Sequence, residues 1–239
     1  MAAVTRNLDF GYTPIQPVEV SRNGETALLI IDMQYHDASP DQGFNLAAER
    51  IQPGSMAYFN ERNESLTIPT IRRLLDYFRH HGLPVLHVVV GTDQRDYADL
   101  PQRMQGWVRE LEERSGVPDL LWSGNPAFRI RDELTPAVDE QVITKHSSGA
   151  FSGSDIDAVL KRMGIRNLVI TGVSTNMCVE STARAAADIG YGCVMVDEAM
   201  ADYDAAAHEA TLRAFHFNFG RVAKTAEDVI ASMDDGAAI

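Results

Sequence analysis

Cys178 is the residue of this 239-residue chain whose position is best suited to chemistry. The apolar residues 167–172 are typical of a buried strand, and residues 180–189 predict an alanine-rich helix that ends at Gly190. Cys178 is therefore expected where a strand passes into the first turn of a helix. Free N–H groups and the positive end of the helix dipole favour a thiolate there, and they can stabilise an oxyanion made from a carbonyl group. Cys178 is a candidate nucleophile, with a small buried core thiol as the alternative.

Two further reactive residues follow expected strands. Asp32 comes directly after the apolar run 26–31, and Lys145 follows residues 141–144. Because ligands bind at the carboxyl ends of parallel strands, these residues and Cys178 are expected at one edge of a sheet. An acid, a lysine and a cysteine form a plausible set of base, electrostatic group and nucleophile. Taken singly, Asp32 could be a turn former and Lys145 a solvated surface residue.

The elements that must position these residues alternate between strand and helix. This pattern predicts an α/β fold, with a doubly wound, mostly parallel β-sheet that carries helices on both faces. Residues 25–239 are expected to form a single domain, and residues 1–24 an arm without periodicity. The polar segment 37–62 is expected to be a functional loop or cap. The expected strands are 26–31, 85–90, 141–144, 167–172, 192–196 and 221–223, and the expected helices are 65–81, 105–114, 155–163, 180–189, 205–217 and 226–233.

Composition excludes several classes of partner. The net charge of −13 argues against nucleic acid and against an anionic membrane. No apolar run of about 18 residues indicates a transmembrane helix, and no N-terminal apolar segment indicates a signal peptide. The two cysteines, Cys178 and Cys193, are too few for a disulfide framework. Reduced thiols and a cytoplasmic location are therefore expected.

Other polar and aromatic residues give weaker indications. His146 adjoins Lys145 and could face the site. Tyr35, Phe44 and Phe151 are candidates for the wall of a substrate pocket, with plain packing as the alternative for each. The histidines show no spacing typical of metal ligands, so we expect no metal and no cofactor.

Three segments together resemble the isochorismatase-like cysteine hydrolase family. They are residues 28–34 (LLIIDMQ), Lys145 followed by residues 148–151 (SGAF), and residues 170–184 (ITGVSTNMCVESTAR). The similarity covers about residues 27–233. The resemblance implies a doubly wound α/β sheet and a catalytic triad of Asp32, Lys145 and Cys178. It also implies a cis peptide bond at Val173–Ser174, with the N–H groups of Ser174 and Cys178 as the oxyanion hole.

Individual residues separate the branches of this family. Isochorismatases cleave a vinyl ether and lack the cysteine, whereas nicotinamidases carry an Asp-x-His metal motif. Here Cys178 is present, Asp32 is followed by Met33 and Gln34, and Asp93 is followed by Gln94 and Arg95. The chain therefore resembles the amidase branch, which includes N-carbamoylsarcosine amidase, ureidoacrylate amidohydrolase and biuret hydrolase.

The resemblance implies hydrolysis of a small amide through a thioester intermediate. The expected substrate is a carbamoyl, ureido or primary amide compound, and the expected assembly is a homo-oligomer, either a dimer or a tetramer. Two alternatives stay open: an amidase for a nicotinamide-like or maleamate-like substrate, and a non-enzymatic protein built on the same fold.

Overall fold

The computed structural model describes residues 16–239. Most of the expected N-terminal arm, residues 1–15, lies outside the described residues. Within the remainder of that arm, Val18 exchanges two backbone hydrogen bonds of 3.0 Å with Ile239 at the other end of the chain.

One six-stranded sheet forms the centre of the fold, with the strand order β3-β2-β1-β4-β5-β6 and every neighbouring pair parallel. The chain winds outward from β1 to one edge and then from β4 to the other, so the doubly wound α/β prediction is confirmed. The order reverses between β1 and β4, where ligands bind in such sheets. The strands are β1 (Thr26–Ile31), β2 (Val85–Val90), β3 (Gln141–Lys145), β4 (Asn167–Val173), β5 (Gly192–Ala201) and β6 (Arg221–Ala223).

Helices cover both faces of this sheet. Alternate strand residues point to opposite faces, so Leu28 and Ile30 pack against one set of helices while Leu29 and Ile31 pack against the other. The first set is α3 (Ala57–Arg62), α4 (Ile68–His80) and α10 (Ala226–Asp235), and the second is α6 (Ala150–Gly153), α7 (Ile156–Arg162), α8 (Glu180–Asp188) and α9 (Ala205–Asn218).

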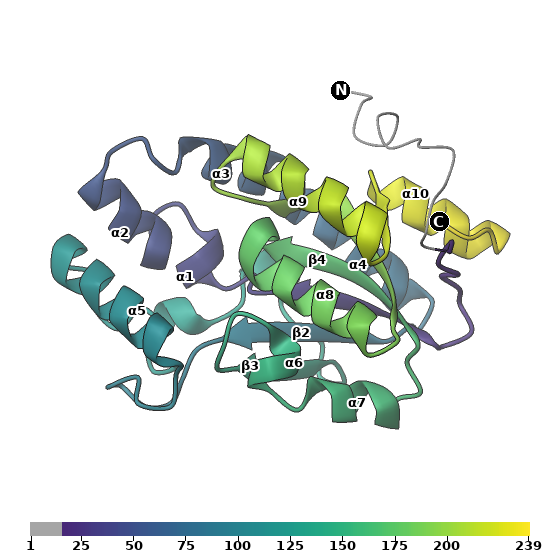
Figure 1. Cartoon of the computed structure of the whole chain (residues 1–239), viewed down its shortest axis with the longest axis horizontal. Coiled ribbons are helices and arrows are strands. Elements are labelled where there is room, and N and C mark those ends of the chain that lie inside the picture. The colour runs from purple at the N-terminus through teal and green to yellow at the C-terminus, as the bar shows by residue number, and fades with distance from the viewer. Residues whose placement is uncertain (1–15) are drawn as a thin grey trace.

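A third group of helices lies together at the left of Figure 1, beyond the end to which the arrow of β2 points. It consists of α1 (Tyr35–Ala38), α2 (Gly43–Ile51) and α5 (Gln102–Ser115). Phe44 of α2 and Met104 and Val108 of α5 belong to one buried apolar cluster. This group stands over the carboxyl ends of the strands, so it can form the wall of a site there.

The segment 37–62 is helical and is not a loop, and two of its residues, Asp37 and Phe44, line the pocket that reaches Cys178. It contains the second half of α1 and all of α2 and α3, because apolar residues such as Phe44 and Phe59 fall on inward faces while most of the polar residues face outward. Helix α3 also continues through a π-helical turn, η2 (Asn63–Thr67), into α4. The helix expected at residue 65 therefore starts at residue 57, and Pro69 lies inside a longer helical run.

The remaining differences lie in the lengths of elements and in short helical turns that were not expected, such as α6. Helix α5 is longer at both ends than expected, and β5 runs on to Ala201. Short 3₁₀ turns, η3 (Pro126–Phe128) and η4 (Asp132–Leu134), lie between α5 and β3. Within residues 16–239, no helix combines the length and apolar character that a membrane crossing requires.

Candidate active site

The ends of three strands bring Asp32, Lys145 and Cys178 together. Asp32 directly follows β1, Lys145 is the last residue of β3, and Cys178 lies in the π-helical turn η5 (Thr175–Val179) that joins β4 to α8. The Lys145 ammonium lies 2.9 Å from Asp32 Oδ2 and donates a hydrogen bond of 3.3 Å to Cys178 Sγ. A single cation therefore contacts both the carboxylate and the sulfur.

Burial sets the protonation states of this trio. Asp32 and Lys145 are 1% and 0% exposed. Burial raises the pKa of Asp32 to about 6, although the nearby charge of Lys145 opposes the rise. Burial alone would lower the pKa of Lys145, but the charge of Asp32, its hydrogen bond and the other nearby acidic groups together outweigh burial and hold that pKa above its usual value. The pair is therefore ionic at neutral pH.

The thiol of Cys178 differs from the thiolate expected at a helix start. Burial, together with the negative charge of Asp32, raises the pKa of Cys178 well above its usual value. The sulfur is therefore protonated at neutral pH. Because Lys145 favours the thiolate and Asp32 can take its proton, the anion is best formed during attack on a substrate.

A close approach of two chain segments places Asp32 beside the cysteine turn. Asp32 has a positive φ of 53°, a conformation that aspartate tolerates better than most residues. Gly172 in β4 has φ 115°, and a Cβ there would lie 2.0 Å from the carbonyl oxygen of Ile31. The Val173–Ser174 peptide bond that follows is cis, as the resemblance implied. Only glycine at position 172 lets β1 and β4 end this close together.

A polar network holds the cysteine turn in place. Thr175 Oγ1 and His208 Nδ1 lie 2.8 Å apart, and His208 Nε2 lies 2.9 Å from Asp197 Oδ1. The N–H of Asn176 donates a hydrogen bond of 2.6 Å to Asp202 Oδ2. The turn therefore has side-chain partners on α9 and in the segment after β5, and Asp197 of β5 holds His208 in place.

A partly open pocket reaches Cys178, and the empty space in it and in its open mouth together is about 430 Å³. Of the residues suggested by sequence, Asp32, Cys178, Ser174 and Phe44 line it. Lys145 lies behind this surface. The full lining is Asp32, Asp37, Phe44, Val90, Arg103, Met104, Trp107, Leu121, Ser148, Val173, Ser174, Met177, Cys178 and Tyr203.

The other three suggested binding residues are placed outside that lining. The Tyr35 ring lies 4.2 Å from the guanidinium of Arg129. Phe151 packs with its ring 5.8 Å from that of Tyr191, and His146 Nδ1 lies 3.3 Å from Asp99 Oδ2. Tyr35, Phe151 and His146 thus have partners in the fold instead of positions in the pocket wall.

Sequence reasoning missed several polar and aromatic residues of the pocket. Trp107 stacks on Phe44 at 4.8 Å, and Arg103, one turn earlier on α5, donates a hydrogen bond of 2.8 Å to Ser148 Oγ. Tyr203 comes from the segment just after β5. Trp107 lay on the expected helix 105–114, but Arg103 preceded that helix, and nothing in the sequence showed which face of it meets the site.

Asp37 is the other missed residue, and burial raises its pKa to about 7. Its neighbour His36 is buried between Phe44 and Phe128, with ring centroids 5.6 Å and 5.9 Å away. Burial lowers the pKa of His36 to about 4, so that ring is neutral. Among the described residues, no group of three or more His, Cys, Asp or Glu side chains could hold a metal ion.

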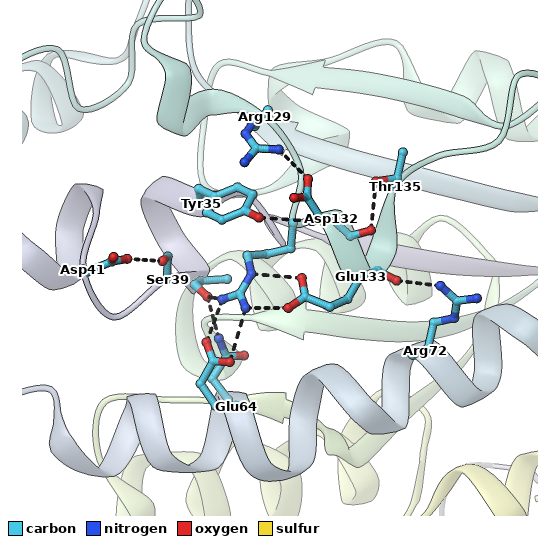
Figure 2. Close-up of polar contacts among 12 residues, drawn as sticks. Tyr35, Ser39, Asp41, Glu64, Arg72, Arg129, Asp132, Glu133 and Thr135 are labelled. Atoms are coloured by element: carbon cyan, nitrogen blue, oxygen red, sulfur yellow. Dashed lines mark hydrogen bonds and ion pairs between the residues drawn. The ribbon is translucent and has the colours of Figure 1, made fainter.

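Helix α1, which carries Asp37, is anchored by a buried arginine. Arg131 Nη1 donates hydrogen bonds to Ala38 O, at 2.5 Å, and to Glu64 Oε1, at 2.7 Å. Its Nη2 donates to Glu133 Oε1 at 2.8 Å. In Figure 2 the carboxylates of Glu64 and Glu133 converge from two separate segments. This cluster fixes the end of α1 beside the pocket.

Comparison with known proteins finds one family model and several relatives that match most of the chain. A family model described as an isochorismatase domain matches residues 26–227. A ureidoacrylate amidohydrolase of Pseudomonas syringae pv. syringae is 33% identical over 183 residues, which cover 73% of this chain and 70% of that protein.

Two solved structures share the fold. A cysteine hydrolase from Pseudomonas syringae pv. phaseolicola superposes with a TM-score of 0.75 at 21% identity, over 93% of this chain and 99% of that one. An N-carbamoylsarcosine amidase from Thermoplasma acidophilum superposes with a TM-score of 0.58 at 21% identity, over 85% and 97%.

Proposed function

The chain belongs to the isochorismatase family, and from that premise we propose that it is a cysteine-dependent amidohydrolase. It cleaves the C–N bond of a small carbamoyl, ureido or primary amide compound through a thioester intermediate. The observation that carries this proposal is the position of the Lys145 ammonium, 2.9 Å from Asp32 Oδ2 and 3.3 Å from Cys178 Sγ. A base, a fixed cation and a thiol in contact are the groups that acyl transfer requires.

The reaction begins with loss of the thiol proton. Asp32, whose pKa is about 6, is ionised at neutral pH and is basic enough to accept the proton of Cys178. The sulfur attacks the carbonyl carbon, and the electron pair of the C=O bond moves to the oxygen. The N–H groups of Ser174 and Cys178 are the proposed donors to that oxyanion. Lys145 stabilises the negative charge as it shifts between Asp32 and the sulfur.

Departure of the amine completes the first half of the reaction. The oxyanion reforms the carbonyl, the C–N bond breaks, and protonated Asp32 gives its proton to the leaving nitrogen. Asp32 is again a carboxylate, so it can take a proton from a water molecule that attacks the thioester. The C–S bond then breaks, and the proton on Asp32 returns to the sulfur. The enzyme regains its starting state after consuming one water molecule.

The names of similar proteins support the substrate class. The relative that is 33% identical is named a ureidoacrylate amidohydrolase, and another protein with this fold is an N-carbamoylsarcosine amidase. Both names describe enzymes that act on a carbamoyl group attached to nitrogen. We therefore favour a ureido substrate over a nicotinamide-like or maleamate-like one.

The test is release of ammonia from a panel of ureido acids, nicotinamide and maleamate. Cys178→Ala should lower kcat/KM by about 1,000-fold or more, since the nucleophile is lost. Cys193→Ala is the matched control, because Cys193 lies buried in β5, 1% exposed, where burial raises its pKa to about 12. Mass spectrometry of acid-quenched enzyme should find the acyl adduct on Cys178. Full activity in Cys178→Ala would refute the proposal.

A further inference from the structure

Asp37 is a pocket carboxylate that the proposed mechanism does not use. It lies on α1, five residues after Asp32, and lines the same pocket as Cys178. Its side chain is 15% exposed, and its buried Oδ2 has no hydrogen-bond partner within residues 16–239. A buried acceptor without a donor is unfavourable, so such an atom at a pocket wall is suited to accept a hydrogen bond from a ligand.

The cationic side chains near Asp37 are engaged or uncharged. An ammonium group has three donors, and Lys145 directs its ammonium at Asp32 Oδ2, Cys178 Sγ and the carbonyl oxygen of Ser147, at 2.9, 3.3 and 3.0 Å. His36 Nε2 lies 3.7 Å from Asp37 Oδ2, which exceeds hydrogen-bond distance, and burial keeps that ring neutral. Neither neighbour therefore supplies a donor to Asp37 Oδ2.

The backbone around Asp37 cannot easily withdraw the side chain. Arg131 and Asn63 both donate hydrogen bonds to the carbonyl oxygen of Ala38, at 2.5 and 3.0 Å. Asn45 donates to the carbonyl oxygen of Asp37 itself at 3.3 Å. Three side chains from different segments thus hold this short helix, so the carboxylate is positioned before a ligand arrives.

We propose that Asp37 is a specificity-determining residue, which accepts a hydrogen bond from an N–H group next to the scissile carbonyl and so selects ureido compounds over plain carboxamides. This inference rests on the proposed function. A ureido carbonyl has nitrogen on both sides. One nitrogen leaves with the proton from Asp32, and the other presents its N–H to Asp37. A carboxamide has carbon at the second position, so it would leave the Asp37 oxygen unpaired, and sites with such unpaired groups reject the analogue strongly.

A matched pair of substrates tests the inference. 3-Ureidopropionate and 4-carbamoylbutanoate differ only in having NH or CH₂ beside the carbonyl group. The quantity to measure is the ratio of their kcat/KM values, because comparing this ratio between enzyme variants cancels the intrinsic reactivity of each compound. In Asp37→Leu the preference for the ureido compound should fall by about 10- to 100-fold. Asp37→Asn keeps an acceptor oxygen and should retain part of the preference.

Asp41→Asn is the control variant. It changes a neighbouring exposed carboxylate that accepts a hydrogen bond from Ser39, and it should leave the ratio within about 3-fold of wild type. An unchanged ratio in Asp37→Leu, or equal loss for both compounds, would overturn the inference while the amidase proposal stands.

A binding measurement separates the two proposals. Calorimetry with Cys178→Ser protein should show tighter binding of 3-ureidopropionate than of 4-carbamoylbutanoate, and adding Asp37→Leu should abolish the difference. If wild-type enzyme releases no ammonia from any compound of the panel but this binding preference depends on Asp37, the amidase proposal fails while the role of Asp37 in recognising the ureido N–H is supported. If the Cys178→Ser protein binds both compounds equally, or neither, the inference is wrong.

Discussion

The Lys145 ammonium donates a 3.3 Å hydrogen bond to Cys178 Sγ, although β3, which ends in Lys145, lies at the edge of the sheet and is separated from β4 by β2 and β1. The lysine side chain crosses only part of that distance, so Asp32 and the cysteine turn must approach it from the ends of β1 and β4. The ammonium contacts both the carboxylate and the sulfur, so replacing Lys145 tests its electrostatic effect on both groups.

Lys145→Met should lower kcat by about 100-fold or more, because the fixed cation stabilises charge at both reacting groups. The acid limb of the pH profile should also move. Activity requires ionised Asp32 and falls as pH drops through its pKa, which is about 6 with Lys145 present. Lys145 lowers that pKa, so its loss raises it, and the limb shifts to higher pH. Lys161→Met, which removes an exposed lysine on α7, is the control. An unshifted limb would contradict the coupling.

Arg103→Gln should raise KM for anionic substrates by about 10-fold and leave kcat nearly unchanged. Arg103 is exposed and lines the mouth of the pocket, where it donates a hydrogen bond to Ser148. In a protein of net charge −13, a cation at that place attracts an anion that the rest of the surface repels. Arg109→Gln changes an exposed arginine of the same helix and serves as the control. Equal effects on charged and neutral substrates would exclude this role.

Arg131→Met should destabilise the protein by about 2–3 kcal/mol, because it removes one of the two donors to the carbonyl oxygen of Ala38 and takes the arginine partner from two carboxylates. The value is limited by the partial exposure of Glu64 and Glu133. Arg129→Met removes an exposed pair with Asp132 and should cost less than about 1 kcal/mol. Urea unfolding measures both changes. Hydrogen exchange should show faster exchange in α1 for Arg131→Met alone, and equal stabilities would disprove the anchoring role.

Gly172→Ala should cost about 3 kcal/mol or more, because the new Cβ would lie 2.0 Å from the carbonyl oxygen of Ile31. The strand ends would have to separate, so activity should fall as well. Gly164→Ala is a close control, since Gly164 has a positive φ of 74° but no atom within 4 Å of the added Cβ, and it should cost about 1 kcal/mol. Thermal unfolding and kcat/KM measure the difference. Similar losses at both glycines would show that the close approach is unimportant.

The sequence by itself determined the succession of strands and helices along the chain. Each buried strand is a short apolar run, such as residues 85–90, and each run is long enough to be recognised without knowledge of its neighbours. Alternation with helices then implied a parallel sheet, and a parallel sheet brings the ends of its strands to one edge. The order of residues along the chain therefore sufficed to place Asp32, Lys145 and Cys178 together.

The tertiary structure alone decided the pocket around these residues and their protonation. Asp37 lies in a polar segment whose sequence did not predict helices. Its three short helices are stabilised by the packing of their apolar residues against α5 and the sheet. The thiolate expected for Cys178 followed from local helix geometry, whereas burial and the charge of Asp32, which come from distant segments, raise its pKa instead. Secondary structure depends largely on neighbours along the chain. Solvation and charge depend on neighbours in space, so they are settled only when the chain has folded.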